Sequence, residues 1–344
     1  MTDEMMGKLY KSDSIFVVAE LSGNHNNDLD LALRTVKAIA DSGADAIKVQ
    51  TYRPESLTLN LRDGLFAPRT AGIWRGLVPW EVFSQAALPY EWHAKLKDAA
   101  ERLGLVFFST PFDLEGVDFL EELGVPMYKI ASLEINDVLL LRRVASRKKP
   151  MLISTGAATK SEIEAAVSIC RDTGCDDLTL LKCTSQYPAK IEDANLRTLQ
   201  DMHSVFRTKV GLSDHTMGSL VPVLSVAYGA TVIEKHFILD RSLGGPDAPF
   251  SMEPQEFREM VNSVRQAQLA LGKVTYDLTE EDRLRRRSLF FVTDLEEGAV
   301  IRAQDIRSIR PGHGLAPEYL DSLLGRTLAS PVKAGTPTSW EHFA

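Results

Sequence analysis

Residues 209–236, with the sequence KVGLSDHTMGSLVPVLSVAYGATVIEKH, decide the predicted fold of this 344-residue chain. They contain two short apolar runs that each end in polar residues, with a helical stretch between them. The pattern occurs eight times, and its apolar runs end at Glu20 and at residues 48–50, 109–110, 129–132, 154–155, 182–185, 213–215 and 234–236. Eight strand–helix units close a parallel (β/α)8 TIM barrel, which carries its catalytic residues at the C-terminal strand ends. We therefore predict an α/β barrel with these polar residues at one mouth.

The remaining sequence predicts a second, smaller domain. The barrel is assigned to residues 1–272, which fits the roughly 250 residues typical of this fold. Residues 273–287 (KVTYDLTEEDRLRRR) are charged and are predicted to be a linker with a short helix. Residues 288–344 contain short strand-like runs separated by glycine and proline, which predicts a β-rich domain with a thin core. Within the barrel, residues 51–88 form a long connection of the kind that often serves as a lid or binding loop.

Composition narrows the classes of function. The formal net charge of −8 argues against non-specific nucleic-acid binding. No apolar stretch approaches the ~20 residues of a membrane span. The N-terminal sequence MTDEMMGKLYKSDS lacks the apolar core of a secretory signal, so we expect a cytoplasmic protein. The three cysteines form no CxxC motif, which is typical of a reducing compartment. We expect free thiols that act as small apolar side chains, with a nucleophilic Cys183 as the alternative.

Two histidines form a candidate metal site. His215 and His236 end adjacent predicted strands, so their imidazoles can meet at the mouth. Two neutral imidazoles with oxygen ligands suit a divalent transition metal, although both rings could instead only hydrogen bond to neighbours. Glu234 shares the parity of His236 and should also point inward. Lys235 points outward, where we expect a salt bridge to a flanking helix. His93 is expected on the exterior of a helix.

Lysines and hydroxyls form a candidate anion site. Lys48 and Lys129 end the second and fourth predicted strands, and a lysine inside a barrel is costly unless an anion pairs with it. Glu20 ends the first strand and is a candidate general acid/base and a candidate structural partner of Lys48, and it could be both. Hydroxyl groups surround these ends, at Ser109, Thr110, Ser132, Ser154, Thr155, Thr184, Ser185 and Ser213. We predict a site for phosphate and carboxylate groups, the alternative being that each hydroxyl caps the following helix.

Two loops add candidate binding residues. In residues 243–247 (LGGPD) the glycines permit close backbone approach, and Asp247 could hold a sugar hydroxyl. In the small domain, residues 309–314 (IRPGHG) predict a rigid turn with an exposed Arg310. That turn is either an ordinary surface loop or the carrier of an arginine that reaches into a neighbouring pocket.

Together these residues resemble the N-acetylneuraminate (sialic acid) synthase family over nearly the whole chain, from residue 15 to residue 343. The resemblance is carried by AELSGNHN at 19–26, IKVQT at 47–51, FSTPFD at 108–113, YKIAS at 128–132, ISTG at 153–156, GLSDHT at 211–216 and EKHF at 234–237. The terminal segment resembles the antifreeze-like (SAF) domain of that family. The resemblance implies a transferase that condenses phosphoenolpyruvate with an open-chain amino-sugar aldehyde. The implied products are a nine-carbon 2-keto acid and phosphate, released by C–O cleavage.

The resemblance also implies roles for individual residues. His215 and His236 would hold a divalent metal, manganese, with magnesium or cobalt as alternatives, and Glu20 would be the acid/base. Phosphoenolpyruvate would contact Lys48, Thr110, Lys129, Ser132, Ser154, Ser185 and Ser213. The sugar would lie near Tyr187, Glu234 and Asp247. Arg310 would reach the acylamino group from the partner subunit of a homodimer, whose small domain caps the site. Ser185 departs from the pattern, because sialic acid synthases have asparagine there.

Within that family, three segments resemble the pseudaminic acid synthase branch. They are Leu133-Glu134-Ile135, where sialic acid synthases carry Gly-Glu, and residues 72–76 (GIWRG) and 243–247 (LGGPD). The implied sugar is 2,4-diacetamido-2,4,6-trideoxy-L-altrose, and Leu133 or Trp74 could contact its 6-methyl group. The alternatives are a legionaminic or N-acetylneuraminic acid synthase that uses a mannose-type sugar, a metal-dependent pyruvate aldolase, and a non-catalytic sugar-binding protein. Nucleic acids and membranes are not expected as partners.

Overall fold

The structure is a computed structural model that describes residues 14–70, 72 and 74–344. The chain divides into two compact units, Met1–Gly272 and Lys273–Ala344. The N-terminal sequence considered above, up to residue 13, lies outside the described residues, as does Ile73 of the segment 72–76.

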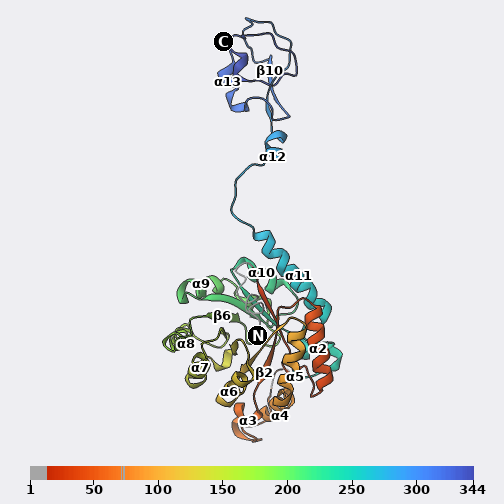
Figure 1. The fold of residues 1–344 in the computed structure, drawn as a ribbon, viewed down its shortest axis with the longest axis vertical. Helices are drawn as coiled ribbons and strands as arrows, with labels where there is room; N and C mark the ends of the chain where they lie inside the picture. Colours follow the sequence, from red (N-terminus) through yellow and green to blue (C-terminus); the bar gives the residue numbers. More distant parts are fainter. Residues whose placement is uncertain (1–13, 71, 73) are drawn as a thin grey trace. The chain divides into compact units, whose positions relative to one another are not determined.

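Eight parallel strands close into a barrel in the first unit, as the sequence predicts (Figure 1). Neighbouring strands follow chain order, and the last strand pairs with the first to complete the ring. The strands are β1 (Phe16–Glu20), β2 (Ala46–Thr51), β3 (Val106–Pro111), β4 (Tyr128–Ile130), β5 (Met151–Ser154), β6 (Leu178–Cys183), β7 (Lys209–Asp214) and β8 (Val232–His236).

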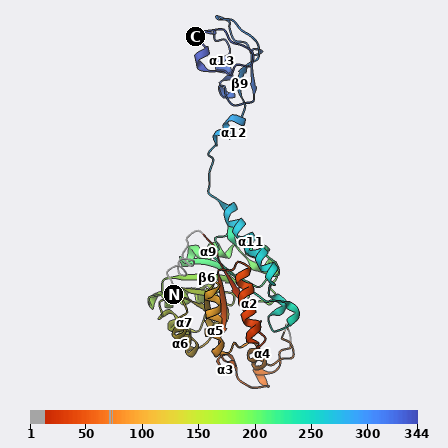
Figure 2. The same ribbon diagram turned by 45° about the vertical axis from the view of Figure 1, so that its right-hand side comes forward.

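Helices surround this barrel, as Figure 1 and the rotated view in Figure 2 show. Their buried apolar side chains form one continuous core with the outward-facing residues of the strands. Gly124 illustrates how a helix ends at the back of the barrel, since its positive φ of 74° forms a left-handed stop. The helices are α2 (Leu29–Asp41), α5 (Tyr90–Arg102), α6 (Leu114–Leu123), α7 (Val138–Ala145), α8 (Lys160–Asp172), α9 (Thr198–Phe206), α10 (Leu220–Ala227) and α11 (Pro254–Leu271).

Strand parity separates the barrel interior into an apolar part and a polar mouth. Side chains alternate between the two faces of a strand, so Phe16, Val18 and Glu20 of β1 share one face. Phe16 and Val18 belong to a buried cluster of nine apolar residues, eight from six of the strands and one, Met127, directly before β4, while Glu20 lies beyond them at the C-terminal end. At the opposite end of the strands, a separate cavity of about 480 Å³ is lined by apolar side chains that include Phe16 and Val232. The apolar cluster therefore lies between that cavity and the polar mouth.

The long connection after β2 contains short helices, at α3 (Pro54–Leu57), η1 (Gly64–Phe66) and α4 (Pro79–Ala86). One of its side chains reaches another loop, because the indole Nε1 of Trp74 donates to the carbonyl oxygen of Pro246 at 3.2 Å. The connection is thereby joined to the loop that follows β8.

The second unit has its own small core. β9 (Ser288–Phe291) and β10 (Ile306–Ile309) pair in antiparallel fashion, and the short helices α12 (Glu280–Arg285) and α13 (Leu320–Leu323) accompany them. The strand-like runs expected at 299–301 and 328–331 form only isolated bridges. Within the described part of the chain, no helix combines the length and the apolar character that crossing a membrane requires.

Candidate functional site

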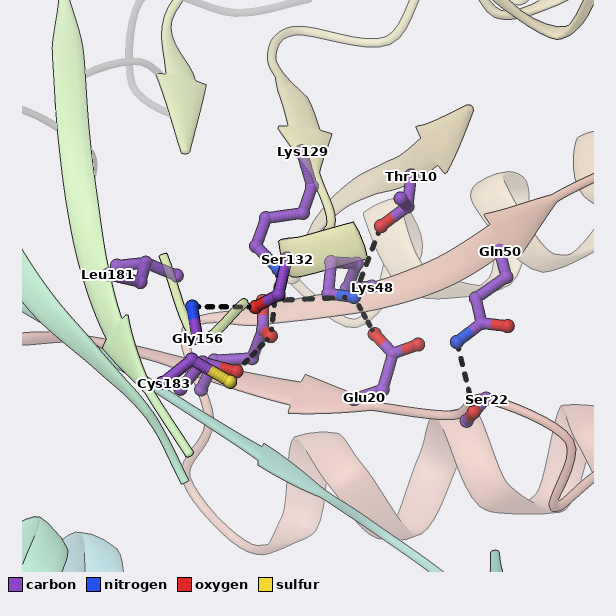
Figure 3. Close-up of polar contacts among 12 residues, drawn as sticks. Glu20, Ser22, Lys48, Gln50, Thr110, Lys129, Ser132, Gly156, Leu181 and Cys183 are labelled. Atoms are coloured by element: carbon purple, nitrogen blue, oxygen red, sulfur yellow. Dashed lines mark hydrogen bonds and ion pairs between the residues drawn. The ribbon is translucent and has the colours of Figure 1, made fainter. Parts of the chain in front are cut away.

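Two lysines and two glutamates form a buried ionic cluster at the C-terminal end of the barrel. The Nζ atom of Lys48 lies 2.5 Å from Oε2 of Glu20 and 3.7 Å from Oε2 of Glu234. It also donates to Oγ1 of Thr110 at 3.2 Å, so Lys48 connects side chains from four strands (Figure 3). The Nζ atom of Lys129 lies 3.2 Å from Oε1 of Glu234. These five side chains are buried, so the charges of the lysines and glutamates are paired with one another inside the cluster.

The cluster shifts the pKa values of Glu20 and Glu234 in opposite directions. Burial raises the pKa of Glu20, and the neighbouring Lys48 only partly opposes this effect. Burial alone would also raise the pKa of Glu234, but Lys129 and Lys48 outweigh it and lower that pKa to about 2. A proton shared by the two therefore resides on Glu20, while Glu234 stays ionised. This difference makes Glu20 the candidate proton donor.

Hydroxyl groups complete the anion side of the site. Ser213 donates to Oε1 of Glu234 at 2.9 Å, and Oγ of Ser132 accepts from the backbone N–H of Gly156 at 3.1 Å. Within the described residues, Oγ of Ser154 and Oε1 of Glu20 are buried and have no hydrogen-bond partner. Buried polar atoms are almost always paired in folded proteins. These two atoms therefore mark positions where a bound molecule would supply the missing partners.

The two candidate metal ligands face each other. The ring centroids of His215 and His236 are 5.2 Å apart, with the planes tilted by 56°. Burial, with the charge of His215 adding to it, holds the pKa of His236 well below its usual range, so this ring is neutral. Its Nδ1 atom is buried and lacks a partner among the described residues. Nδ1 of His215 lies 3.1 Å from the carbonyl oxygen of Thr184.

Two imidazoles with one orphaned nitrogen fit a divalent metal ion. The described residues contain no group of three or more His, Cys, Asp and Glu side chains arranged to hold one. If His215 and His236 hold an ion with two nitrogen ligands, its remaining positions would be open to substrate oxygens or water. Such open positions are typical of catalytic rather than structural metal sites.

Cys183 belongs to the site rather than to the apolar core. Its Sγ atom lies 3.8 Å from Nδ1 of His215 and 3.8 Å from Oγ of Ser185. Burial would raise the pKa of this thiol, but the hydrogen bond to His215 and the charge of that ring lower it to about 7. The other two cysteines behave as expected from the sequence, since burial raises the pKa of Cys170 to about 12 and that of Cys175 to about 11.

Aromatic rings form a second wall beside the histidines. The ring of Tyr187 lies 4.4 Å from that of His215 and 5.0 Å from that of Phe250, measured between centroids. Phe250 also contacts His236, at 4.9 Å, and Trp74 lies 6.0 Å from Tyr187. These rings form an apolar surface next to the imidazoles, of the kind that contacts the carbon face of a sugar.

Asp247 lies on this same side of the mouth. Its Oδ2 atom accepts from the hydroxyl of Ser22 and from the backbone N–H of Gly23, the latter at 3.3 Å. Gln50 donates to Ser22 at 3.1 Å, which links the loop after β8 to β1 and β2. Burial raises the pKa of Asp247. The preceding Gly245 has a φ of +118°, and a Cβ atom there would lie 2.6 Å from Oδ1 of Asn26, so this close approach requires glycine.

Some expected residues have other surroundings in the structure. Arg310 follows β10 in the second unit. Leu133 is 72% exposed, whereas Trp74 packs in the aromatic wall. Among the strand-end hydroxyls, three bond to nearby groups outside the ionic cluster: Ser109 to Thr51 and the Val49 carbonyl, Thr155 to the Leu181 carbonyl, and Thr184 to the Asp193 carbonyl.

The expectations for His93 and for the partner of Lys235 were wrong. His93 is fully buried in α5 rather than exposed, and its Nε2 lies 2.8 Å from Oγ1 of Thr51. Lys235 does point outward, but its partner is Asp214 on the neighbouring strand β7, at 2.5 Å, and not a residue of a flanking helix. Both partners, Thr51 and Asp214, lie on strands. The sequence pattern does not indicate which strand residue contacts a given side chain.

Several residues of the site carried no clear signal in the sequence. Phe250 lies in a loop well after β8, and no periodic pattern places it beside the histidines. Gly156 could have been noticed because it follows Ser154 and Thr155 at a strand end. A Cβ atom at Gly156 would lie 2.4 Å from Oγ of Ser185, so the turn has no room for a larger residue.

Comparison with known proteins places this site in a family. A model of the NeuB family matches residues 35–276, and a model of the SAF domain matches residues 286–344. The chain is 44% identical to the pseudaminic acid synthase of Helicobacter pylori, over 94% of this chain and 96% of that protein. It is 39% identical to the N,N'-diacetyllegionaminic acid synthase of Legionella pneumophila, over 96% and 95% of the two chains.

A solved structure supports the same grouping. The N-acetylneuraminic acid (sialic acid) synthetase of Leptospira borgpetersenii, crystallised with citrate, superimposes with a TM-score of 0.71 at 34% identity. The match covers 78% of this chain and 89% of that one.

Proposed function

The chain belongs to the NeuB family, and from this premise we propose that it condenses phosphoenolpyruvate with 2,4-diacetamido-2,4,6-trideoxy-L-altrose, giving pseudaminic acid and phosphate. It is thus a transferase that forms a C–C bond. The observation that carries the chemistry is the buried Lys48–Glu20 and Lys129–Glu234 cluster beside two facing imidazoles. The choice of sugar rests on the 44% identity with the H. pylori pseudaminic acid synthase.

Phosphoenolpyruvate would bind on the lysine side of the mouth. Its phosphate and carboxylate are anions, and Lys48 and Lys129 are the ammonium groups that can balance them. The buried Oγ of Ser154 lacks a partner among the described residues, so it is available to donate to the same ligand. Hydroxyls from the neighbouring strands complete this contact set: Thr110, Ser132, Ser185 and Ser213. When the phosphate leaves by C–O cleavage, the lysines stabilise the charge that develops on it.

Glu20 would move the protons of the reaction. Its raised pKa favours the protonated form of the carboxyl group, whose proton can be donated to the aldehyde oxygen as C3 of phosphoenolpyruvate forms the new C–C bond. Positive charge then develops at C2, where water adds. The Glu20 carboxylate can accept the proton released by that water. The tetrahedral carbon finally collapses to the ketone, and phosphate departs with the former bridging oxygen.

His215 and His236 would hold a divalent metal, for which we propose manganese. The neutral ring of His236 and its unpartnered Nδ1 within the described structure support this role. When bound there, the ion would supply Lewis-acid polarisation of the aldehyde oxygen. Cys183 would neighbour the ligand His215 rather than act as a nucleophile, because the condensation needs no covalent enzyme intermediate.

The sugar would lie against the aromatic wall. Tyr187, Glu234 and Asp247 offer hydrogen-bonding groups, and Trp74 is better placed than the exposed Leu133 to contact the 6-methyl group. Burial of a methyl group there would stabilise the complex. A 6-hydroxyl in the same place would lose its hydrogen bonds to water without gaining one from the protein. This arrangement favours a 6-deoxy sugar over N-acetylmannosamine.

A legionaminic acid synthase is the second candidate, favoured by the 39% identity with the L. pneumophila enzyme. Steady-state phosphate release with three sugars distinguishes the candidates: the altrose-type 2,4-diacetamido sugar, its mannose-type counterpart and N-acetylmannosamine. We expect the highest kcat/KM with the altrose-type sugar. A higher kcat/KM with either mannose-type sugar would contradict the choice of substrate, and consumption of free pyruvate instead of phosphoenolpyruvate would indicate an aldolase.

We further propose a cytoplasmic homodimer in which the SAF domain of one subunit caps the site of the other, with Arg310 reaching the acylamino group. The support is the sequence position of Arg310 in a glycine- and proline-containing turn of a small domain. Light scattering of the active enzyme tests the dimer, and fractionation of the producing cells tests the location. A fully active monomer would contradict the role of Arg310.

A further inference from the structure

We propose that Asp214 and Lys235, together with Thr216, form a positioning unit that holds His215 and His236 in register. This inference rests on the proposed role of the two histidines as metal ligands. The two charged residues are register partners on the neighbouring strands β7 and β8, and each directly precedes a histidine in the chain. They point to the outer face of the barrel, whereas the histidines turn toward the mouth.

The pair is short and fully enclosed. Nζ of Lys235 lies 2.5 Å from Oδ2 of Asp214, and the side chains are only 1% and 3% exposed. Removing two such charges from water costs several kcal/mol per ion, which their mutual attraction offsets only when the geometry is good and further hydrogen bonds are made. A pair of apolar side chains could fill the same space without that cost. The pair is therefore better explained by the geometry that it imposes than by stability alone.

Those further hydrogen bonds converge on Thr216, the residue after His215. Asp214 accepts from the backbone N–H of Thr216 at 3.1 Å and from its hydroxyl at 3.0 Å. Lys235 donates to the backbone carbonyl of Thr216 at 2.5 Å. All three polar groups of Thr216 are thus bound by the pair. The chain on both sides of His215 is held by the same two side chains, one of which precedes His236.

This connection gives the unit a defined role. Metal affinity depends on the orientation of the imidazole rings, and replacing the residues that orient such ligands changes it by about 10–100-fold. Asp214 and Lys235 tie the turn that carries His215 to the strand that carries His236. Without the contacts among Asp214, Lys235 and Thr216, both histidines would remain, but these contacts would no longer fix the distance between their rings.

A second ion pair provides a matched control. Asp45 lies 2.5 Å from Arg265 and accepts from the backbone N–H of Val17 at 2.8 Å, so it also joins a charge pair to a strand backbone. Asp45 immediately precedes β2 and therefore lies at the N-terminal end of the barrel. A substitution there should lower the free energy of unfolding without reaching the histidines.

The test measures Mn²⁺ affinity and stability separately on the full-length protein. Electron paramagnetic resonance of free Mn²⁺ gives the dissociation constant, and urea unfolding gives stability. We expect Lys235→Met to weaken Mn²⁺ binding by at least about tenfold. Thr216→Val, which removes only the hydroxyl, should weaken it by a smaller factor. Asp45→Asn should lose stability while its dissociation constant stays at the wild-type value.

The outcomes separate this proposal from the one on which it rests. Wild-type affinity in a folded Lys235→Met variant would overturn the positioning role and leave the metal assignment intact. If Lys235→Met does not fold, Thr216→Val decides, and an unchanged dissociation constant in that variant would overturn the proposal. If Asp45→Asn weakens Mn²⁺ binding as much as Lys235→Met does, the loss of affinity would come from general destabilisation, and the proposal would be overturned. A wild-type protein that binds no Mn²⁺ would remove the metal assignment itself, and the proposal with it.

Discussion

The Nζ atom of Lys48 lies 2.5 Å from Oε2 of Glu20. The two residues are register partners on β1 and β2, and both side chains are buried at the mouth of the barrel. The ammonium group opposes the effect of burial on the carboxyl group, and burial prevails, so the pKa of Glu20 is raised. The charge on Lys48 and the protonation of Glu20 are therefore coupled. In the proposed mechanism, this coupling would connect anion binding to proton transfer.

Replacing Lys48 by methionine should remove the positive partner of Glu20, one of the two positive partners of Glu234, and a positive charge near the bound anion. We expect kcat/KM for phosphoenolpyruvate to fall by about 100-fold or more, as for other preorganised charge-stabilising groups. Lys37→Met is the matched control, because Lys37 is an exposed residue of α2 that pairs with the exposed Asp41. Steady-state assays with varied phosphoenolpyruvate measure the effect. Equal losses in the two variants would contradict the assigned role of Lys48.

The pH dependence of catalysis should report on Glu20. Its pKa is raised above the usual 4.5, so the protonated form that donates to the aldehyde persists to higher pH and is lost as pH rises through the raised pKa. The value of kcat/KM should therefore fall on the alkaline side of that pKa. In Glu20→Gln we expect low activity and no such limb. A wild-type limb that survives in this variant would assign the titration to another group.

Two serines of the site should respond in opposite ways. Oγ of Ser154 is buried without a hydrogen-bond partner among the described residues, whereas Ser213 donates to Glu234 at 2.9 Å. Ser154→Ala should leave the free energy of unfolding unchanged or slightly higher, yet raise KM for phosphoenolpyruvate. Ser213→Ala should lose about 1–3 kcal/mol of stability, because it takes a hydrogen bond from a buried carboxylate. Urea unfolding and steady-state kinetics separate the two, and a KM unchanged in Ser154→Ala would remove this residue from the binding site.

His93 should make the stability of the protein depend on pH below neutrality. Burial lowers the pKa of its imidazole from 6.5 to about 4 in the folded state. The unfolded chain therefore takes up a proton before the folded protein does, so stability is full above pH 6.5 and is lost as pH falls toward about 4. The loss attributable to this residue is up to about 3 kcal/mol. Urea unfolding at several pH values should show a shallower slope in His93→Gln, and equal slopes would contradict the assignment.

Subunit mixing tests whether Arg310 acts on the partner subunit. Arg310→Ala and His236→Ala should each be inactive as pure dimers, for lack of the sugar contact and of a metal ligand. A mixed dimer would restore one complete site, made from the intact barrel of one variant and the intact Arg310 of the other. Random pairing then returns about a quarter of the wild-type activity. Failure to recover any activity after exchange of subunits would place Arg310 at its own barrel or outside the site.

The ionic cluster was predictable because it depends on two simple periodicities. Eight strand–helix units imply a closed barrel, and alternation along a strand puts Glu20, Lys48 and Glu234 on its inner face. Polar residues at the ends of such strands must meet at one mouth. The neighbouring positions of His215 and His236 follow from the order of β7 and β8 in the same way.

The remaining features depend on tertiary contacts that no local pattern encodes. His93 is buried where α5 packs against α2 and β3, and its Nε2 contacts Oγ1 of Thr51, the last residue of β2. Lys235 could be placed on the outer face, but its choice of Asp214 over a helix residue depends on the register of β7 against β8. The sequence also could not show whether Trp74 or Leu133 lies beside the site. Trp74 lies there because its indole binds the carbonyl of Pro246, which joins the loop after β2 to the loop after β8.

The position of bond cleavage in phosphoenolpyruvate tests the central claim most directly. The substrate is prepared with ¹⁸O in the oxygen that bridges C2 and phosphorus, and the enzyme is supplied with the altrose-type sugar. Mass spectrometry then locates the label in the products. We predict that the label appears in the released inorganic phosphate, as C–O cleavage requires. Unlabelled phosphate, with the ¹⁸O retained on the carbon product, would contradict this account.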